Sequence, residues 1–119
     1  MSVTRNTKYG DINISKEAIT SLAGGVVSEC YGVVGMASQK MLKDGLAELL
    51  KKENYAKGVI VTEKDGMLDL DLYIIVSHGV KISEVVNEVQ KKVKYVLEQS
   101  LDIEIHAVNV YVQGVKVIE

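Results

Sequence analysis

The chain has 119 residues, enough for one domain with its own core but not for two. Its net charge of −2 excludes a global basic field of the kind that holds nucleic acid phosphates. One cysteine excludes an internal disulfide and fits a reducing compartment. No stretch approaches the ~20 apolar residues that span a membrane. We therefore expect a cytoplasmic protein without direct membrane insertion.

The chain is expected to begin with an arm and a short strand. Residues 1–8 are polar, which predicts a flexible N-terminal arm ahead of a single domain at residues 9–119. Ile12 and Ile14 alternate with polar residues, and this period of two is typical of a strand.

A helix is predicted next, with Ser15 as its N-cap and apolar residues at three- and four-residue spacing up to Cys30. Gly24 and Gly25 lie inside it, where each glycine costs roughly 1 kcal/mol relative to alanine. Such a pair is explained either by close packing of the helix against a strand or by a kink in the helix. We favour close packing. Gly32 is expected to end the helix.

The middle of the chain predicts a strand at residues 33–37 and a weaker helix at residues 40–52, laid over the edge of the core. A strand at residues 58–63 follows. Asp65 and Gly66 then supply the positive φ angles that a hairpin turn requires.

Two periods meet in residues 68–101. Alternate residues from Leu68 to Val76 are apolar, which predicts a half-buried strand. From Ile82 to Leu101 the apolar residues fall at spacings of three and four, as in an amphipathic helix, with Ser83 as a plausible N-cap.

In the last predicted strand the apolar residues change from odd to even positions. Ile103 and Ile105 would lie on one face of a regular strand but Val108 and Val110 on the other, so we expect a bulge near His106. The tail at residues 115–118 suits a further short strand. The predicted fold is an α+β two-layer sandwich, in which a mixed β-sheet carries two main amphipathic helices on one face and includes a parallel βαβ unit.

Nothing in the sequence predicts an enzyme, a cofactor or a metal site. No phosphate-binding glycine loop, nucleophile motif or C-x-x-C pair occurs. Two histidines without cysteine or spaced carboxylate partners make a poor zinc site. Cys30 is interpreted as a small core residue. His78, in a turn before Gly79, is interpreted as a polar turn residue, with a small-ligand site as the weaker alternative.

The sheet face without helices is the candidate site. Tyrosine and aliphatic residues in an acidic setting are typical of protein interfaces. A second layer, formed by the weaker helix or by the tail, explains this face equally well. The candidate interface residues are Asp69, Asp71, Tyr73, Ile75, Tyr111 and Gln113.

RNA binding is the alternative function. Gly32 and Gly35 outline a G-x-x-G loop, which some RNA-binding domains place against the phosphate backbone. Lysines of the long helix would supply positive charge, yet glutamates are interleaved with them and no aromatic stacking set accompanies them. Nucleic acid is therefore an unlikely partner.

Several segments together resemble the alkaline shock protein family of Gram-positive bacteria, also called envelope stress response proteins. The matching pieces include GDINIS at 10–15, YGVVGM at 31–36, GVIV at 58–61, LDLYIIV at 70–76, GVKI at 79–82 and VNVYVQGV at 108–115. The resemblance spans nearly the whole chain in the same order.

The resemblance implies a non-enzymatic cytoplasmic protein for cell-envelope homeostasis or stress, with no catalytic residues to carry over. Some members are tethered at the membrane by a separate membrane protein and self-associate there. The resemblance therefore implies a scaffold or adaptor that binds itself and a protein partner, with a membrane-anchored protein as one candidate for that partner. Residues 41–56 fall where the family is expected to vary, and they are candidates for setting partner choice.

Overall fold

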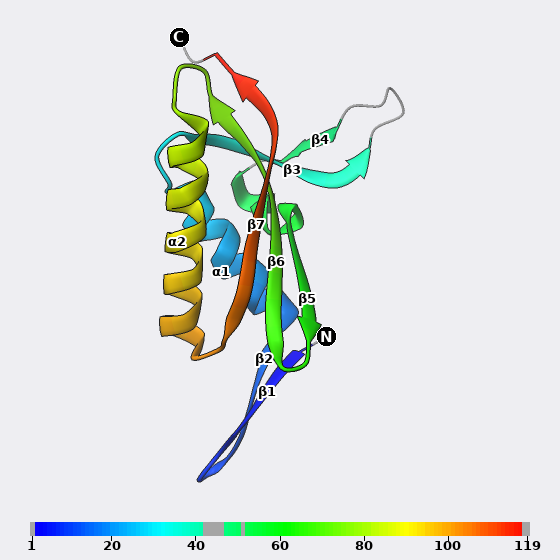
Figure 1. Ribbon diagram of the computed structural model, residues 1–119. Helices are drawn as coiled ribbons and strands as arrows, with labels where there is room; N and C mark the ends of the chain where they lie inside the picture. Colours follow the sequence, from blue (N-terminus) through cyan, green and yellow to red (C-terminus); the bar gives the residue numbers. More distant parts are fainter. Residues whose placement is uncertain (1, 42–46, 51, 118–119) are drawn as a thin grey trace.

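The structure, a computed structural model, describes residues 2–41, 47–50 and 52–117 (Figure 1). The order of elements in the described residues is β1 (Ser2–Thr7), β2 (Gly10–Ser15), α1 (Lys16–Ser28), β3 (Val33–Met41), β4 (Ala47–Leu50), the 3₁₀ helix η1 (Lys52–Gly58), β5 (Val59–Lys64), β6 (Met67–Ser77), α2 (Ile82–Leu101) and β7 (Ile105–Lys116). Helices and strands alternate irregularly, which makes this an α+β fold, as the sequence predicts.

Strand β6 is the centre of the main sheet. Its first half pairs with β5 and its second half with β3, both antiparallel, while β7 pairs parallel along its other edge. Strand β4 extends the sheet beyond β3. Helix α2 is the crossover between the parallel strands β6 and β7, so the predicted βαβ unit and the mixed sheet are both confirmed.

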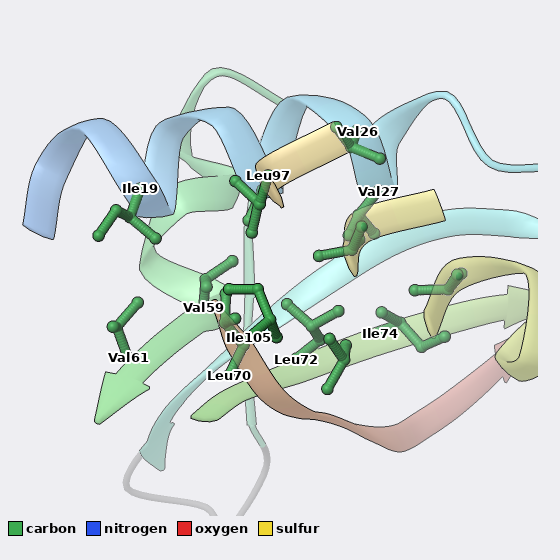
Figure 2. Packing of buried hydrophobic residues seen from close by; sticks show 14 of the residues in the cluster. Ile19, Val26, Val27, Val59, Val61, Leu70, Leu72, Ile74, Leu97 and Ile105 are labelled. Carbon is green, nitrogen blue, oxygen red and sulfur yellow. The ribbon is translucent and has the colours of Figure 1, made fainter. Parts of the chain in front are cut away.

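The core lies between one face of this sheet and the two helices (Figure 2). Alternate β6 residues from Leu68 to Val76 are each 1% exposed or less. Helix α1 buries residues such as Ile19 and Val27 against them, and α2 buries a stripe that includes Val89 and Leu97. The period of two in the strand and the spacing of three and four in the helices therefore meet in one apolar layer.

Local signals explain most of the helix and turn boundaries. Ser15 is the N-cap of α1, and its hydroxyl accepts a hydrogen bond from the Ala18 N–H at 3.1 Å. Asp65 and Gly66 have φ of 53° and 79° and form the β5–β6 turn. The predicted N-cap Ser83 is wrong, since α2 begins at Ile82, before that serine is reached.

Gly24 is packed closely, as expected, but its neighbour is a helix rather than a strand. A Cβ at Gly24 would lie 3.1 Å from the Ala56 nitrogen in η1. Gly25 has nothing within 4 Å of such a Cβ, so the packing argument applies only to the first glycine of the pair.

The helix predicted at residues 40–52 is wrong. Strand β3 continues to Met41 and pairs antiparallel with β4, so that Met36 faces Leu50 and Ala37 faces Leu49. Leucines at this spacing suit either a helix or a strand, and the neighbouring edge of β3 decides for the strand. Residues 42–46 and 51, which the predicted helix included, lie outside the described residues.

The structure has a strand where the sequence predicts an N-terminal arm. Strands β1 and β2 form an antiparallel hairpin, in which the Thr4 hydroxyl donates to Asn13 Oδ1 at 2.7 Å. Polar residues on both faces gave no alternation from which β1 could be predicted. We call this pair of strands the N-terminal hairpin. The assignment of residues 9–119 to a single domain stays a prediction.

Candidate interaction face

The sheet face opposite the helices carries a second, polar and aromatic set of side chains. We call it the open face, defined by residues that strands β6 and β7 direct away from the core: Asp69, Asp71, Tyr73, Ile75, His106, Asn109 and Tyr111. It exists because β6 alternates, so that each buried aliphatic residue is followed by one on the other side.

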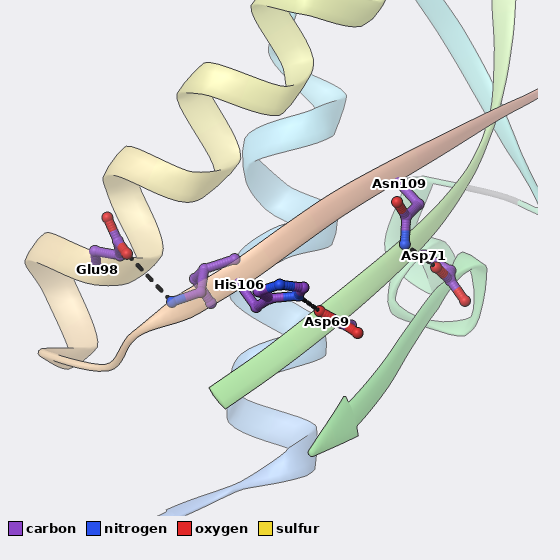
Figure 3. A network of polar contacts seen from close by, with 6 residues as sticks. Asp69, Asp71, Glu98, His106 and Asn109 are labelled. Carbon is purple, nitrogen blue, oxygen red and sulfur yellow. Dashed lines mark hydrogen bonds and ion pairs between the residues drawn. The ribbon is translucent and has the colours of Figure 1, made fainter. Parts of the chain in front are cut away.

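Three cross-strand pairs run in a row along this face. His106 Nδ1 lies 2.8 Å from Asp69 Oδ1, and Asn109 Nδ2 donates to Asp71 Oδ1 at 2.9 Å (Figure 3). The rings of Tyr73 and Tyr111 are stacked, with centroids 4.9 Å apart and planes 14° apart. Asp69, Asp71 and Tyr73 are therefore each held in place by a β7 side chain.

The pairing depends on the predicted bulge. Leu68 pairs with Ile105 but Asp69 pairs with Ala107, so β7 inserts His106 as one extra residue. This insertion brings Val108 back to the core side and leaves His106 beside Asp69. A second irregularity, between Ile74 and Ile75 of β6, inserts one more residue near the end of β7.

The structure brings most of the predicted interface residues together. Asp69, Asp71, Tyr73 and Tyr111 occupy the centre of the open face, and Tyr111 is 44% exposed. Gln113 is the extra residue of the second bulge and is exposed, beyond that centre.

Ile75 shares the open face but is only 9% exposed, and it pairs with Gly35 on one side and Gly114 on the other. It therefore contributes little contact area. His106 and Asn109 are the members that the sequence analysis did not assign to this face. The predicted bulge was the signal, because it fixes the parity of every β7 residue after it.

The alternative of a second layer over this face fails for both proposed segments. The weaker helix does not form, as described above. The tail continues β7 as far as Lys116 instead of folding back as a separate strand. Within the described residues, neither segment supplies a layer on this side.

The histidine and the cysteine considered as candidate site residues both have structural surroundings that explain them. His78 is exposed in the β6–α2 turn, where its backbone N–H donates to the Lys116 carbonyl at 2.8 Å. Cys30 is buried, with its Sγ 3.4 Å from the Val26 carbonyl, and burial raises the pKa of its thiol. The thiol therefore stays protonated, which suits a core residue rather than a nucleophile. The described residues include no group of three His, Cys, Asp or Glu that could hold a metal ion.

The G-x-x-G segment does not form an exposed loop. Gly32 has φ of 86°, and a Cβ there would come 2.5 Å from Val85 Cγ2 of α2. Gly35 lies within β3 and pairs with Ile75. Gly32 therefore serves packing against α2 and Gly35 belongs to a paired strand, so the two do not form a backbone cradle for an RNA phosphate.

Comparisons with known proteins give one family model and several relatives. The model of the alkaline shock protein 23 family, described as having a cell envelope-related function, matches residues 4–117. The uncharacterized protein YloU of Bacillus subtilis is 52% identical over 117 residues, covering 98% of each chain. The uncharacterized protein Spy1614 of Streptococcus pyogenes is 48% identical over 118 residues, covering 99% of this chain and 98% of its own.

A more distant relative is the uncharacterized protein YqhY of Bacillus subtilis, 31% identical over 111 residues, covering 93% of this chain and 81% of its own. No solved structure matches the chain at a significant level. No helix within the described residues is long and apolar enough to cross a membrane.

Proposed function

The chain belongs to the alkaline shock protein 23 family, whose function is described as cell envelope-related, and from this premise we propose that it is a non-enzymatic scaffold. It associates with itself and holds an envelope-associated protein partner. It works in the cytoplasm and reaches the membrane through that partner.

The open face is the single observation that supports this proposal. Its stacked tyrosines stand at the end of a row that begins with the His106–Asp69 and Asn109–Asp71 pairs. Aromatic residues are enriched in protein interfaces, and groups fixed beforehand lose little conformational entropy on binding. A row of hydrogen-bonded and stacked side chains on an open sheet face is therefore suited to a protein partner.

The test is a tagged pull-down from detergent-solubilised native cells, run with and without nuclease. We expect envelope proteins to be retained by the parent after nuclease treatment. They should be lost when Tyr73 and Tyr111 are both replaced by alanine, because the replacement removes the aromatic centre of the open face.

The matched control is Tyr31→Ala, since Tyr31 is 83% exposed and lies in the α1–β3 connection, away from the open face. This variant should retain the same proteins as the parent. Loss of every partner on nuclease treatment would mean that RNA holds the complex together, and the scaffold would be abandoned. Equal capture by the double variant would remove the open face from the interface.

A further inference from the structure

The tip of the N-terminal hairpin carries a tyrosine that the rest of the chain leaves exposed. Tyr9, at this tip, is 90% exposed, and the Lys8 ammonium lies 5.5 Å from the centroid of its ring. A large aromatic side chain gains nothing from folding in this position, because it stays in water. A two-stranded hairpin is also only marginally stable in isolation.

A hollow of about 280 Å³ lies at the end of the open face, beside the β5–β6 turn. It is lined by Lys64, Asp65, Met67, Asp69 and His106. Pockets for drug-sized ligands measure roughly 300–1,000 Å³ and are mostly apolar. This hollow is smaller, and its lining carries two carboxylates, Asp65 and Asp69, beside the Lys64 ammonium and the His106 ring. It therefore suits one inserted side chain better than a free metabolite.

The chemistry of the hollow matches the hairpin tip. Met67 is 37% exposed, and a thioether makes favourable contacts with an aromatic ring. Asp65 and Asp69 supply carboxylates for a lysine ammonium, and a carboxylate also accepts a hydrogen bond from a phenol. Tyr9 and Lys8 carry this ring, phenol and ammonium side by side.

The hairpin cannot fill the hollow of its own chain in this conformation. The described residues that line the hollow come from β5, the β5–β6 turn, β6 and β7. The hairpin projects past the β5–β6 turn (Figure 1), and its six-residue strands extend about 20 Å at 3.4 Å a residue. The tip therefore lies beyond its own hollow and is presented to another molecule.

We propose that the Lys8–Tyr9 tip of one copy inserts into the hollow of a second copy at Asp65, Met67 and Asp69. The tip and the β5–β6 turn, whose residues line the hollow, lie at the same end of the molecule, so a two-fold axis makes the exchange reciprocal and closes a dimer. This inference rests on the proposed function, since it names one contact of the self-association.

Sedimentation equilibrium of the full chain tests the contact, with the parent compared to Tyr9→Ala and to Tyr31→Ala. Both tyrosines are almost fully exposed, so neither substitution disturbs the core. We expect Tyr9→Ala to weaken the dimer at least about tenfold, as truncation of a central aromatic anchor does. Tyr31→Ala should leave the dissociation constant unchanged. Lys8→Glu should also weaken the dimer, because it places a carboxylate against Asp65 and Asp69.

A cross-link shows whether the contact is between copies. A tagged Tyr9→Cys chain is mixed with a Met67→Cys chain and treated with a short bis-maleimide, with Cys30 left buried in both. A heterodimer should form rapidly in this mixture and slowly when Tyr31→Cys replaces Tyr9→Cys. Equal rates in the two mixtures would overturn the contact.

The outcomes separate this inference from the proposed function. A parent that stays monomeric at all concentrations would overturn both. A parent that associates as well after Tyr9→Ala as before would overturn the hairpin contact alone, and the open face would remain the candidate for self-association.

Discussion

The two faces of β6 are built from alternate residues of one strand and behave in opposite ways. On the covered face, leucines and other aliphatic residues are almost completely removed from water by α1 and α2. On the open face, the residues between them pair with β7 and stay partly exposed. One side of the strand therefore stabilises the fold, while the other keeps its paired side chains partly exposed.

The magnitudes support this division. Full burial of a leucine side chain contributes about 1.5–3 kcal/mol, whereas a typical hydrogen bond contributes a net 0.5–1.5 kcal/mol. Several leucines on the covered face therefore outweigh the polar pairs of the open face. Substitutions on the open face are therefore expected to leave the protein folded.

The strongest test of the comparison is to truncate one residue on each face. Leu72→Ala removes a side chain that is completely buried, and we expect it to lower the free energy of unfolding by about 2–5 kcal/mol. Tyr111→Ala removes a partly exposed ring, and the lost stacking and burial should cost about 1 kcal/mol. Urea unfolding followed by circular dichroism measures both. Equal losses would show that the open face is part of the core.

A second test concerns the packing of α2 against Gly32, beside the covered face. Gly32→Ala adds a methyl group 2.5 Å from Val85 Cγ2 at a position with positive φ. Backbone strain of about 1–2 kcal/mol and overpacking of about 1–3 kcal/mol should both lower the free energy of unfolding.

Gly79→Ala is the matched control, because Gly79 also has positive φ but open space around its Cβ position. It should show the backbone strain alone. The difference between the two variants then measures the packing contribution, and its removal in a Gly32→Ala/Val85→Ala double variant would identify Val85 as the cause. No difference between the glycine variants would exclude tight packing of α2 at this point.

The same comparison explains how much of the fold was predictable. Periodicity predicts β6, α2, β7 and the helical layer, because each long element carries one continuous apolar pattern. The β5–β6 turn follows from Asp65 and Gly66. The helix predicted at residues 40–52 is wrong because the leucine spacing there fits both a helix and a strand. The pairing of β4 with the edge of β3, which decides for the strand, cannot be predicted from the local sequence. Strand β1 was missed because polar strands have no periodic signal.

For the candidate site, the alternation of β6 placed Asp69, Asp71 and Tyr73 on one face. The predicted bulge near His106 is confirmed by the register shift between Leu68 and Asp69. His106 and Asn109 reach Asp69 and Asp71 only through the register of β6 and β7, which a single sequence does not specify between bulges. The hollow beside the β5–β6 turn likewise joins residues from β5, β6 and β7, and no local pattern indicates it.

The smallest predicted effect sharpens the comparison most. Asp71 and Asn109 form one hydrogen bond on the open face, where water can replace either partner. A double-mutant cycle with Asp71→Ala and Asn109→Ala should give a coupling free energy of about 0.5–1.5 kcal/mol in urea unfolding. If the open face holds the partner, the same substitutions should reduce capture in the pull-down far more than they reduce stability. The reason is that each substitution leaves the remaining side chain, Asn109 or Asp71, without the hydrogen bond that fixes it in the complex. A loss of capture that only follows the loss of stability would mean that this pair serves the fold and not the interface.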